Sequence, residues 1–220
     1  MTTSHFPARL TQGYRAFMAG RFAGERNRYR ALGERGQDPE ILLIGCCDSR
    51  VSPEVIFDAG PGEMFVIRNV ANLVPPYEPD SGSYHGTSAA IEFAINVLNI
   101  KHVVVLGHAS CGGVRSVLSG SQPLAHGDFI GKWMSQIHAT AEGLELDGQD
   151  PVADARRLEL ATVGHSLANL MTFPYIRQRV ERGELTLHGA YFGVATGILF
   201  IRDPQTGEFS PCADAAETAG

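Results

Sequence analysis

The stretch ILLIGCCDSR, residues 41–50, predicts the fold, and the stretch VVVLGHASC, residues 103–111, repeats its pattern. Each begins with a short apolar run that ends at a glycine, and a potential metal ligand, Cys46 or His108, follows directly. A short, wholly apolar run between chain breakers is typical of a parallel strand that is covered on both faces. We therefore predict two buried parallel strands with reactive side chains at their carboxyl ends.

These reactive side chains predict a metal site. Open α/β sheets form their sites at the carboxyl ends of the strands, and neighbouring strands lie about 4.8 Å apart. Two cysteine sulfurs and one imidazole, from the pair Cys46-Cys47, from His108 and from Cys111, suit tetrahedral zinc with a fourth position open for chemistry. We predict one Zn²⁺ per chain, and the residues alone leave open which of Cys46 and Cys47 binds it.

The rest of the chain predicts a mostly parallel α/β sheet flanked by helices. Further strands are expected at 64–68 and within the glycine-broken stretch 185–200, and the turn at 203–207 predicts a C-terminal antiparallel pair. Helices are expected at 8–32, 86–98, from 112 onward, 128–145 and 152–182. We expect one domain over residues 1–220, in which residues 1–35 form an N-terminal helical arm.

Composition narrows the class of protein. The chain has 220 residues, 44% of them apolar, and a formal net charge of −6, which argues against a nucleic-acid-binding protein. No run of about 18 apolar residues is present, so no membrane span is expected. The N-terminus lacks the pattern of a secretory signal, and the four cysteines do not form a disulfide framework. We therefore expect a reduced, cytoplasmic protein.

The motifs CxDSR at residues 46–50 and HxxCGG at residues 108–113 resemble those of the β-class carbonic anhydrases, as do the blocks 61–72 and 86–94. The resemblance extends over about residues 30–200. It implies reversible hydration of carbon dioxide to bicarbonate and a proton through zinc-bound hydroxide. It also implies that Cys46, His108 and Cys111 bind the metal, that Cys47 is a small buried residue, and that Asp48 and Arg50 form the catalytic pair.

Physical chemistry supports these roles. Asp48 lies two residues beyond Cys46 and projects to the same side of an extended backbone. A two-pronged hydrogen bond from Arg50 keeps the Asp48 carboxylate ionised and away from the metal. Two thiolates cancel the charge of Zn²⁺ and weaken it as a Lewis acid. The pKa of bound water is therefore predicted to exceed about 7, with activity rising into mildly alkaline pH.

The resemblance also implies a pocket for carbon dioxide and bicarbonate, with an apolar wall that suits an uncharged substrate. Its residues are Gln37, Phe65, Val70, Phe93 and Gly112. Phe93 replaces a tyrosine of the plant-like members and removes one hydroxyl group. Members that bicarbonate inhibits carry a tryptophan and a tyrosine where this chain has Leu43 and Phe192. The plant-like, non-allosteric subtype is therefore favoured.

Assembly and two alternative functions complete the expectations. In the family, N-terminal helices embrace a partner subunit, so a homodimer or homotetramer is expected. Relatives with this fold hydrolyse carbonyl sulfide or carbon disulfide with the same zinc ligands, and the sequence does not separate that activity from hydration. A non-catalytic zinc or thiol redox module that uses Cys46 and Cys47 is the third hypothesis. The intact run Asp48-Ser49-Arg50 argues against it, because a structural zinc needs no such pair.

Overall fold

The computed structural model describes residues 6–79, 84–119, 129–146 and 148–212. The chain divides into two compact units, residues 1–38 and residues 39–220. The boundary falls close to the end of the expected arm, and the expectation of a single domain stays a prediction.

The first unit consists of two helices, α1 (Ala8–Ala19) and α2 (Arg21–Arg35). The prediction of one continuous helix over 8–32 is wrong, because the helix is interrupted at Gly20, where φ is −105° and ψ is −91°. Glycine is a weak helix former and accepts such a bend at little cost. The bend lets Phe17 meet Phe22 and Tyr29, with ring centroids 5.7 Å away in both cases.

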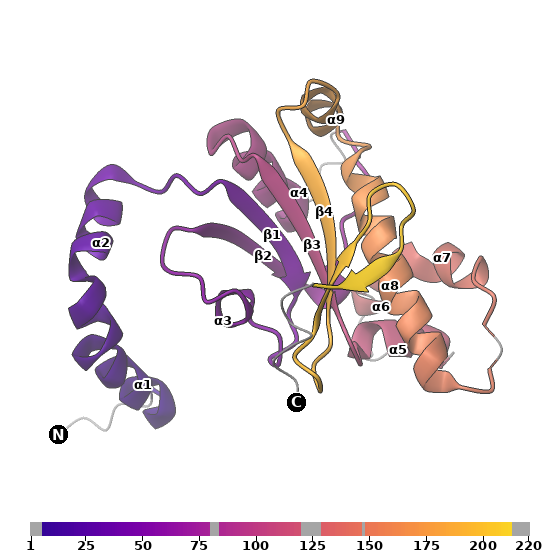
Figure 1. Ribbon diagram of the computed structural model, residues 1–220, viewed down its shortest axis with the longest axis horizontal. Helices are drawn as coiled ribbons and strands as arrows, with labels where there is room; N and C mark the ends of the chain where they lie inside the picture. The colour runs from indigo at the N-terminus through magenta and orange to yellow at the C-terminus, as the bar shows by residue number, and fades with distance from the viewer. Residues whose placement is uncertain (1–5, 80–83, 120–128, 147, 213–220) are drawn as a thin grey trace. The chain divides into compact units, whose positions relative to one another are not determined.

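The second unit is built on a six-stranded sheet in the order β2-β1-β3-β4-β5-β6 (Figure 1). Its strands are β1 (Ile41–Cys46), β2 (Met64–Asn69), β3 (His102–His108), β4 (Thr186–Phe192), β5 (Leu199–Arg202) and β6 (Phe209–Pro211). The first four strands are parallel, and β5 and β6 are antiparallel. The predicted mostly parallel sheet with a C-terminal antiparallel pair is confirmed.

The α-helices described in this unit are α3 (Pro53–Ile56), α4 (Gly86–Glu92), α5 (Gly112–Leu118), α6 (Phe129–Met134), α7 (His138–Glu142), α8 (Pro151–Leu170) and α9 (Pro174–Glu181). Three predicted helices differ from these boundaries. The predicted helix 86–98 changes to a π-helix at Phe93–Val97. The one at 128–145, whose first residue lies outside the described residues, contains the 3₁₀ turn Ser135–Ile137 between α6 and α7. The one at 152–182 ends at Leu170, and Pro174 begins α9 in the first helical position that proline favours.

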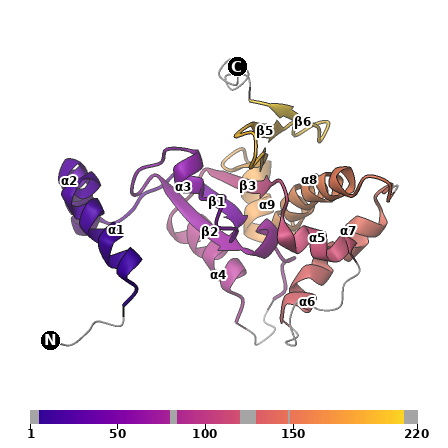
Figure 2. The ribbon, with the colours of Figure 1, turned by 90° about the horizontal axis from the view of Figure 1, so that it is seen from below.

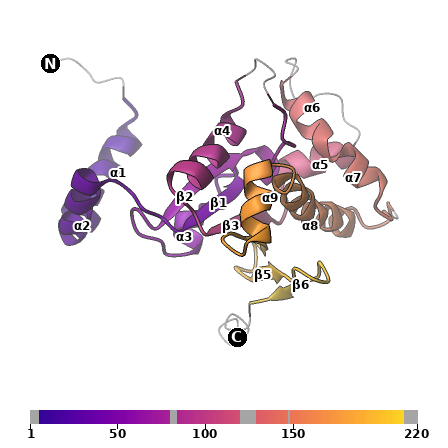
Figure 3. The same ribbon diagram turned by 90° about the horizontal axis from the view of Figure 1, so that it is seen from above.

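The two faces of the sheet are covered unequally. Side chains alternate between the faces along each strand, so Leu42 and Val103 belong to the larger core, which also contains residues of α4, α8 and α9. Leu43 belongs to a smaller cluster on the other face, against which Ile56 of α3 packs. Figures 2 and 3 show α3 and α4 on opposite sides of the sheet. Helix α8 runs along β3 and β4 and so lies beside the end of β3 that bears His108.

Candidate metal centre

Three potential metal ligands meet at the carboxyl ends of β1 and β3. The Sγ atoms of Cys46 and Cys111 and a ring nitrogen of His108 all lie within 4.8 Å of one another. The three residues are 6%, 2% and 1% exposed, respectively. Zinc bonds to sulfur at about 2.3 Å and to histidine nitrogen at about 2.0 Å, which requires ligand atoms that are this close.

The two ring nitrogens of His108 have different surroundings. Its Nδ1 lies 3.0 Å from the carbonyl oxygen of Ala109 and can donate its proton there. The other nitrogen, Nε2, is buried and has no hydrogen-bond partner. A carbonyl that fixes the proton on one ring nitrogen leaves the lone pair of the other free for a metal. His108 therefore fits the role of a neutral imidazole ligand.

The two thiols influence each other strongly. A hydrogen bond from the Cys111 thiol lowers the pKa of Cys46 well below its usual value. The same contact, together with burial, raises the pKa of Cys111 well above its usual value. Two thiolates this close repel each other, so only a cation between them stabilises both in the charged form. The donor set of two sulfurs and one nitrogen is the kind that zinc binds.

The loop after β1 carries the predicted catalytic pair. Arg50 donates from Nε to Oδ1 of Asp48 at 2.9 Å and from Nη2 to Oδ2 at 2.7 Å, and its backbone N–H donates to Oδ1 at 3.0 Å. The Arg50 guanidinium thereby holds the pKa of the Asp48 carboxyl far below its usual range. His108 also acts electrostatically on that carboxyl. The pair is two-pronged, as expected, and borders the metal ligands.

Cys46 rather than Cys47 joins the ligand cluster. The expectation that Cys47 is buried is wrong, because its side chain is exposed. The Cys47 N–H donates to the carbonyl of Asn69 at 2.8 Å and continues the pairing with β2, and Ser49 and Arg50 after it are also exposed. Partial burial and the negative charge of Cys46 raise the pKa of Cys47.

The loop after β3 also leads to the metal ligands, but β3 is shifted by one residue relative to β1. The two glycines that end the apolar runs are not register partners, because Gly45 pairs with Leu106. His108 therefore lies one residue further along the sheet than the sequence pattern indicates. Ser110 has a φ of +60°, a left-handed conformation that makes a turn directly before Cys111. Gly107 is needed here, because a Cβ atom would lie 2.7 Å from Cγ2 of Val163 in α8.

The predicted pocket residues are distributed over different parts of the structure. Val70 packs against the apolar cluster that contains Cys46 and Cys111. Phe65 and Phe93 form an aromatic pair with centroids 5.9 Å apart, and Phe65 packs against the larger core. Gly112, the first residue of α5, is exposed. Gln37 is an exposed residue of the first unit.

Two residues that support the site were not predicted in these roles. Arg68, considered only for its match to the bicarbonate-inhibited members, donates to the carbonyls of Cys46 at 2.9 Å and Asp48 at 2.7 Å. Glu159, on α8, accepts the backbone N–H of Cys111 at 2.9 Å. A sequence signal existed for Glu159, since it lies four residues from both Ala155 and Val163 on the apolar stripe of a helix.

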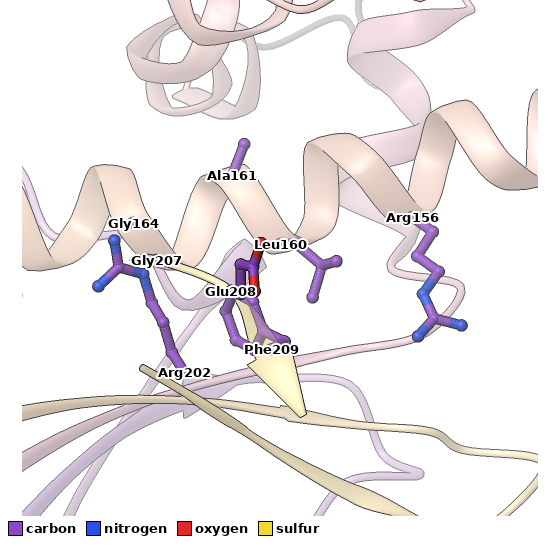
Figure 4. A pocket seen from close by; sticks show the side chains of 8 residues that line it. All are labelled: Arg156, Leu160, Ala161, Gly164, Arg202, Gly207, Glu208 and Phe209. Carbon is purple, nitrogen blue, oxygen red and sulfur yellow. The ribbon is translucent and has the colours of Figure 1, made fainter. Parts of the chain in front are cut away.

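A separate pocket lies between α8 and the end of the sheet formed by β5 and β6 (Figure 4). Its lining residues are Arg156, Leu160, Ala161, Gly164, Arg202, Gly207, Glu208 and Phe209. None of them is a predicted site residue, so the pocket is distinct from the metal ligands. Arg156 lies above the ring of Tyr191, 5.8 Å from its centroid, which places a residue of the pocket beside a strand that borders the centre.

Two cysteines and one histidine meet at the carboxyl ends of adjacent parallel strands. This arrangement defines an α/β protein with a candidate metal centre. The family model described as carbonic anhydrase matches residues 41–199. The chain therefore belongs to the carbonic anhydrase family, in its β class.

Individual relatives agree with this assignment. "Beta carbonic anhydrase 5, chloroplastic" of Arabidopsis thaliana is 35% identical over 190 residues, which cover 83% of this chain and 60% of that protein. The solved structure of the β-carbonic anhydrase CcaA is 30% identical, with a TM-score of 0.85 and coverage of 93% of this chain and 91% of that one. A tetrameric β-carbonic anhydrase of Sordaria macrospora is also 30% identical, with a TM-score of 0.75 and coverage of 91% and 96%.

Proposed function

We propose that this protein catalyses the reversible hydration of carbon dioxide to bicarbonate and a proton with one Zn²⁺ per chain, held by Cys46, His108 and Cys111. The observation that carries the proposal is the buried cluster of these three ligand atoms beside the paired Asp48 and Arg50, in a chain of the β-carbonic anhydrase family. When bound, zinc lowers the pKa of a coordinated water and so supplies a nucleophile near neutral pH.

Asp48 orients that nucleophile. A carboxylate has about four lone-pair positions, and Arg50 occupies three of those on Asp48 with two side-chain donors and one backbone donor. The remaining position can accept a hydrogen bond from water or hydroxyl beside the metal ligands. Because Arg50 keeps the pKa of Asp48 low, the carboxylate stays an acceptor and takes no proton itself.

Arg50 also joins the two ligand-bearing loops. Besides its bonds to Asp48, its Nη2 donates to the carbonyl of Ser110 at 3.1 Å. One guanidinium thus restrains the acceptor on the first loop and the turn that precedes Cys111 on the second. In our proposal this contact keeps Asp48 at the edge of the metal position and prevents it from becoming the fourth ligand.

The carbon dioxide pocket is proposed to include Val70 and the aromatic pair of Phe65 and Phe93, with Gly112 as a polar contact. The packing of Val70 in the same apolar cluster as Cys46 and Cys111 supports its place. Phe93 remains 43% exposed although it stacks on Phe65, which leaves apolar surface for a substrate.

The non-allosteric subtype is also proposed. Leu43 and Phe192, which replace the tryptophan and tyrosine of the bicarbonate-inhibited members, belong to one apolar cluster. Arg68 directs its guanidinium to backbone carbonyls of the first loop. Neither apolar side chain offers a hydrogen-bond donor to an anion, so bicarbonate is expected to act as product and substrate only.

A homodimer or homotetramer is proposed on the basis of the first unit. Leu10, Tyr14 and Met18 lie four residues apart on one face of α1 and are 56%, 61% and 37% exposed. An apolar stripe of this kind on a short helix needs a partner surface. Light scattering should give twice or four times the chain mass, and removal of residues 1–35 should lower it. An unchanged number of chains per particle after removal would contradict the role of the arm.

The cytoplasm is the proposed location. Among the described residues, no helix is both long and apolar enough to span a bilayer. The four cysteines are free thiols in the structure, as a reducing compartment requires. Fractionation of cells that express the tagged protein tests this location, and recovery with a membrane-bounded compartment would contradict it.

Stopped-flow measurement of proton release from carbon dioxide by the zinc-loaded protein tests the proposed reaction. We expect fast turnover that falls by about 100-fold or more in Asp48→Asn, with the zinc content unchanged. Carbonyl sulfide and carbon disulfide are assayed in parallel. Turnover of a sulfur gas without hydration would favour the hydrolase, and stoichiometric zinc without any turnover would favour a non-catalytic zinc protein.

A further inference from the structure

We propose that Glu159 is a positioning residue of the metal centre, which holds Cys111 in place as a ligand by accepting its backbone N–H. The inference rests on the proposed metal site and deepens it, because it assigns a role to a residue that binds neither metal nor substrate. It connects the long helix α8 to the ligand turn after β3.

The contacts of Glu159 leave neither carboxylate oxygen unused. Oε1 accepts the backbone N–H of Cys111 at 2.9 Å, and Oε2 accepts the hydroxyl of Tyr191 at 2.7 Å. Glu159 is 4% exposed and Tyr191 is 2% exposed. Side chains from α8 and β4 thus meet behind the turn that carries Cys111.

A carboxylate at this position requires an explanation. Burial raises the pKa of Glu159, and the hydrogen bonds from Tyr191 and Cys111 act in the opposite direction. Among the salt bridges of the described residues, none involves Glu159. An apolar side chain would pack against Val163 and its neighbours without any desolvation cost. What the carboxylate adds is its two acceptor atoms, and one of them is used on a metal ligand.

Cys111 needs such an acceptor. It precedes α5 with φ −64° and ψ 119°, directly after the left-handed Ser110. Its buried N–H therefore lies outside both the sheet and the helix, and a buried backbone donor requires a partner. The rest of the turn is fixed elsewhere, since the Ala109 N–H donates to the carbonyl of Phe192 at 2.9 Å. Glu159 supplies the remaining restraint, at the ligand itself.

Two further features keep the Glu159 carboxylate in place. Gly107 lets α8 lie directly against β3, because a Cβ atom there would collide with Val163. Arg156, which lines the pocket of Figure 4, covers the rings of Tyr191 and Phe200, with its guanidinium carbon 5.8 Å and 5.1 Å from their centroids. Tyr191 is therefore fixed from outside while its hydroxyl fixes Oε2.

Two conservative variants separate a positioning role from an effect of charge. Glu159→Gln keeps the reach and the acceptor oxygen and removes the charge. Glu159→Asp keeps the charge, but its shorter side chain cannot span both Cys111 and Tyr191. A positioning role predicts that Glu159→Gln binds zinc within about threefold of wild type and that Glu159→Asp binds it about 10–100-fold more weakly. A role through charge alone predicts the reverse order.

Zinc affinity is measured by competition with a chelator, and the ligand set by the absorption spectrum of the cobalt-substituted protein. Circular dichroism verifies that both variants are folded. A Glu159→Asp protein that binds zinc as tightly as wild type would overturn the proposal. Tyr191→Phe provides a second test, because loss of the hydroxyl should weaken zinc binding by less than Glu159→Asp does.

The proposed metal centre is tested separately by Cys111→Ser. If wild type binds no zinc, or if Cys111→Ser binds it like wild type, the metal site itself is wrong. If wild type binds zinc, Cys111→Ser binds it far more weakly, and both Glu159 variants match wild type, the role of Glu159 alone is overturned.

Discussion

The two ligand-bearing loops reach the same point by different means. The loop after β1 contains a local clamp, because Asp48 accepts three hydrogen bonds from Arg50, two positions away, and its carbonyl accepts the N–H of Val51. Arg68 of β2 adds longer-range hydrogen bonds to the backbone carbonyls of this loop. In the loop after β3, Cys111 donates its backbone N–H to Glu159, 48 positions away. The carboxylate of Asp48 is therefore fixed by a local contact, and the backbone of Cys111 is fixed by tertiary packing.

The largest effect should follow from breaking the local loop. Arg50→Gln removes the two-pronged clamp and frees Asp48 to move toward the metal position. We expect kcat/KM for hydration to fall by about 100-fold or more, with little loss of stability because Arg50 is exposed. Arg177→Gln, at an exposed arginine of α9, is the matched control. Equal rates for both variants would show that the clamp has no catalytic role.

The pH dependence of the rate depends on both loops, because each contributes one thiolate. The two thiolates offset the charge of Zn²⁺, so the pKa of the bound water should lie above about 7. Below that pKa, the rate should rise about tenfold per pH unit. Asp48 does not produce this rise. Its lowered pKa keeps it ionised down to strongly acidic pH, and the stability it adds is lost only as the pH falls through that value. A rate that is already constant at pH 6.5 would contradict the prediction.

Gly107→Ala should disturb the second loop and spare the first. The added Cβ lies 2.7 Å from Val163 Cγ2 and pushes α8, with Glu159, away from β3. We expect a loss of about 1–3 kcal/mol in the free energy of unfolding, measured by denaturant titration. Val163→Ala in the same chain should restore much of it. Gly164→Ala, on the same helix with open space around it, should not destabilise.

The smallest effect concerns the support beneath the second loop. Trp133 donates from Nε1 to the carbonyl of Val70 at 2.8 Å, and Val70 lies against Gly113 at the start of α5. Trp133→Phe should cost about 1 kcal/mol of unfolding free energy, and Lys132→Gln, next to it and exposed, should cost less. Thermal denaturation compares the two, and equal midpoints would mean that the bond contributes nothing.

The sequence was informative where interactions are local. The apolar runs predicted β1 and β3, and the spacing of Asp48 and Arg50 predicted their pairing, because two residues on one short loop cannot move far apart. The break at Gly20 and the division between α8 and α9 were missed, because the apolar periodicity continues across both. Periodicity does not report whether a glycine bends the helix.

Long-range contacts were beyond prediction from one sequence. Glu159 is one of two acidic residues in α8, and its partner Cys111 becomes visible only after β3 and α8 pack together. The stagger between Gly45 and Gly107 has the same origin, since the register of two strands depends on how their side chains fit.

X-ray absorption at the zinc edge of the purified, zinc-loaded protein tests most directly whether the two loops share one metal. The account predicts one zinc per chain with two sulfur ligands at about 2.3 Å and nitrogen or oxygen ligands at about 2.0–2.1 Å, and a single sulfur in Cys111→Ser. Four protein ligands including a third sulfur, or a spectrum unchanged by Cys111→Ser, would contradict it.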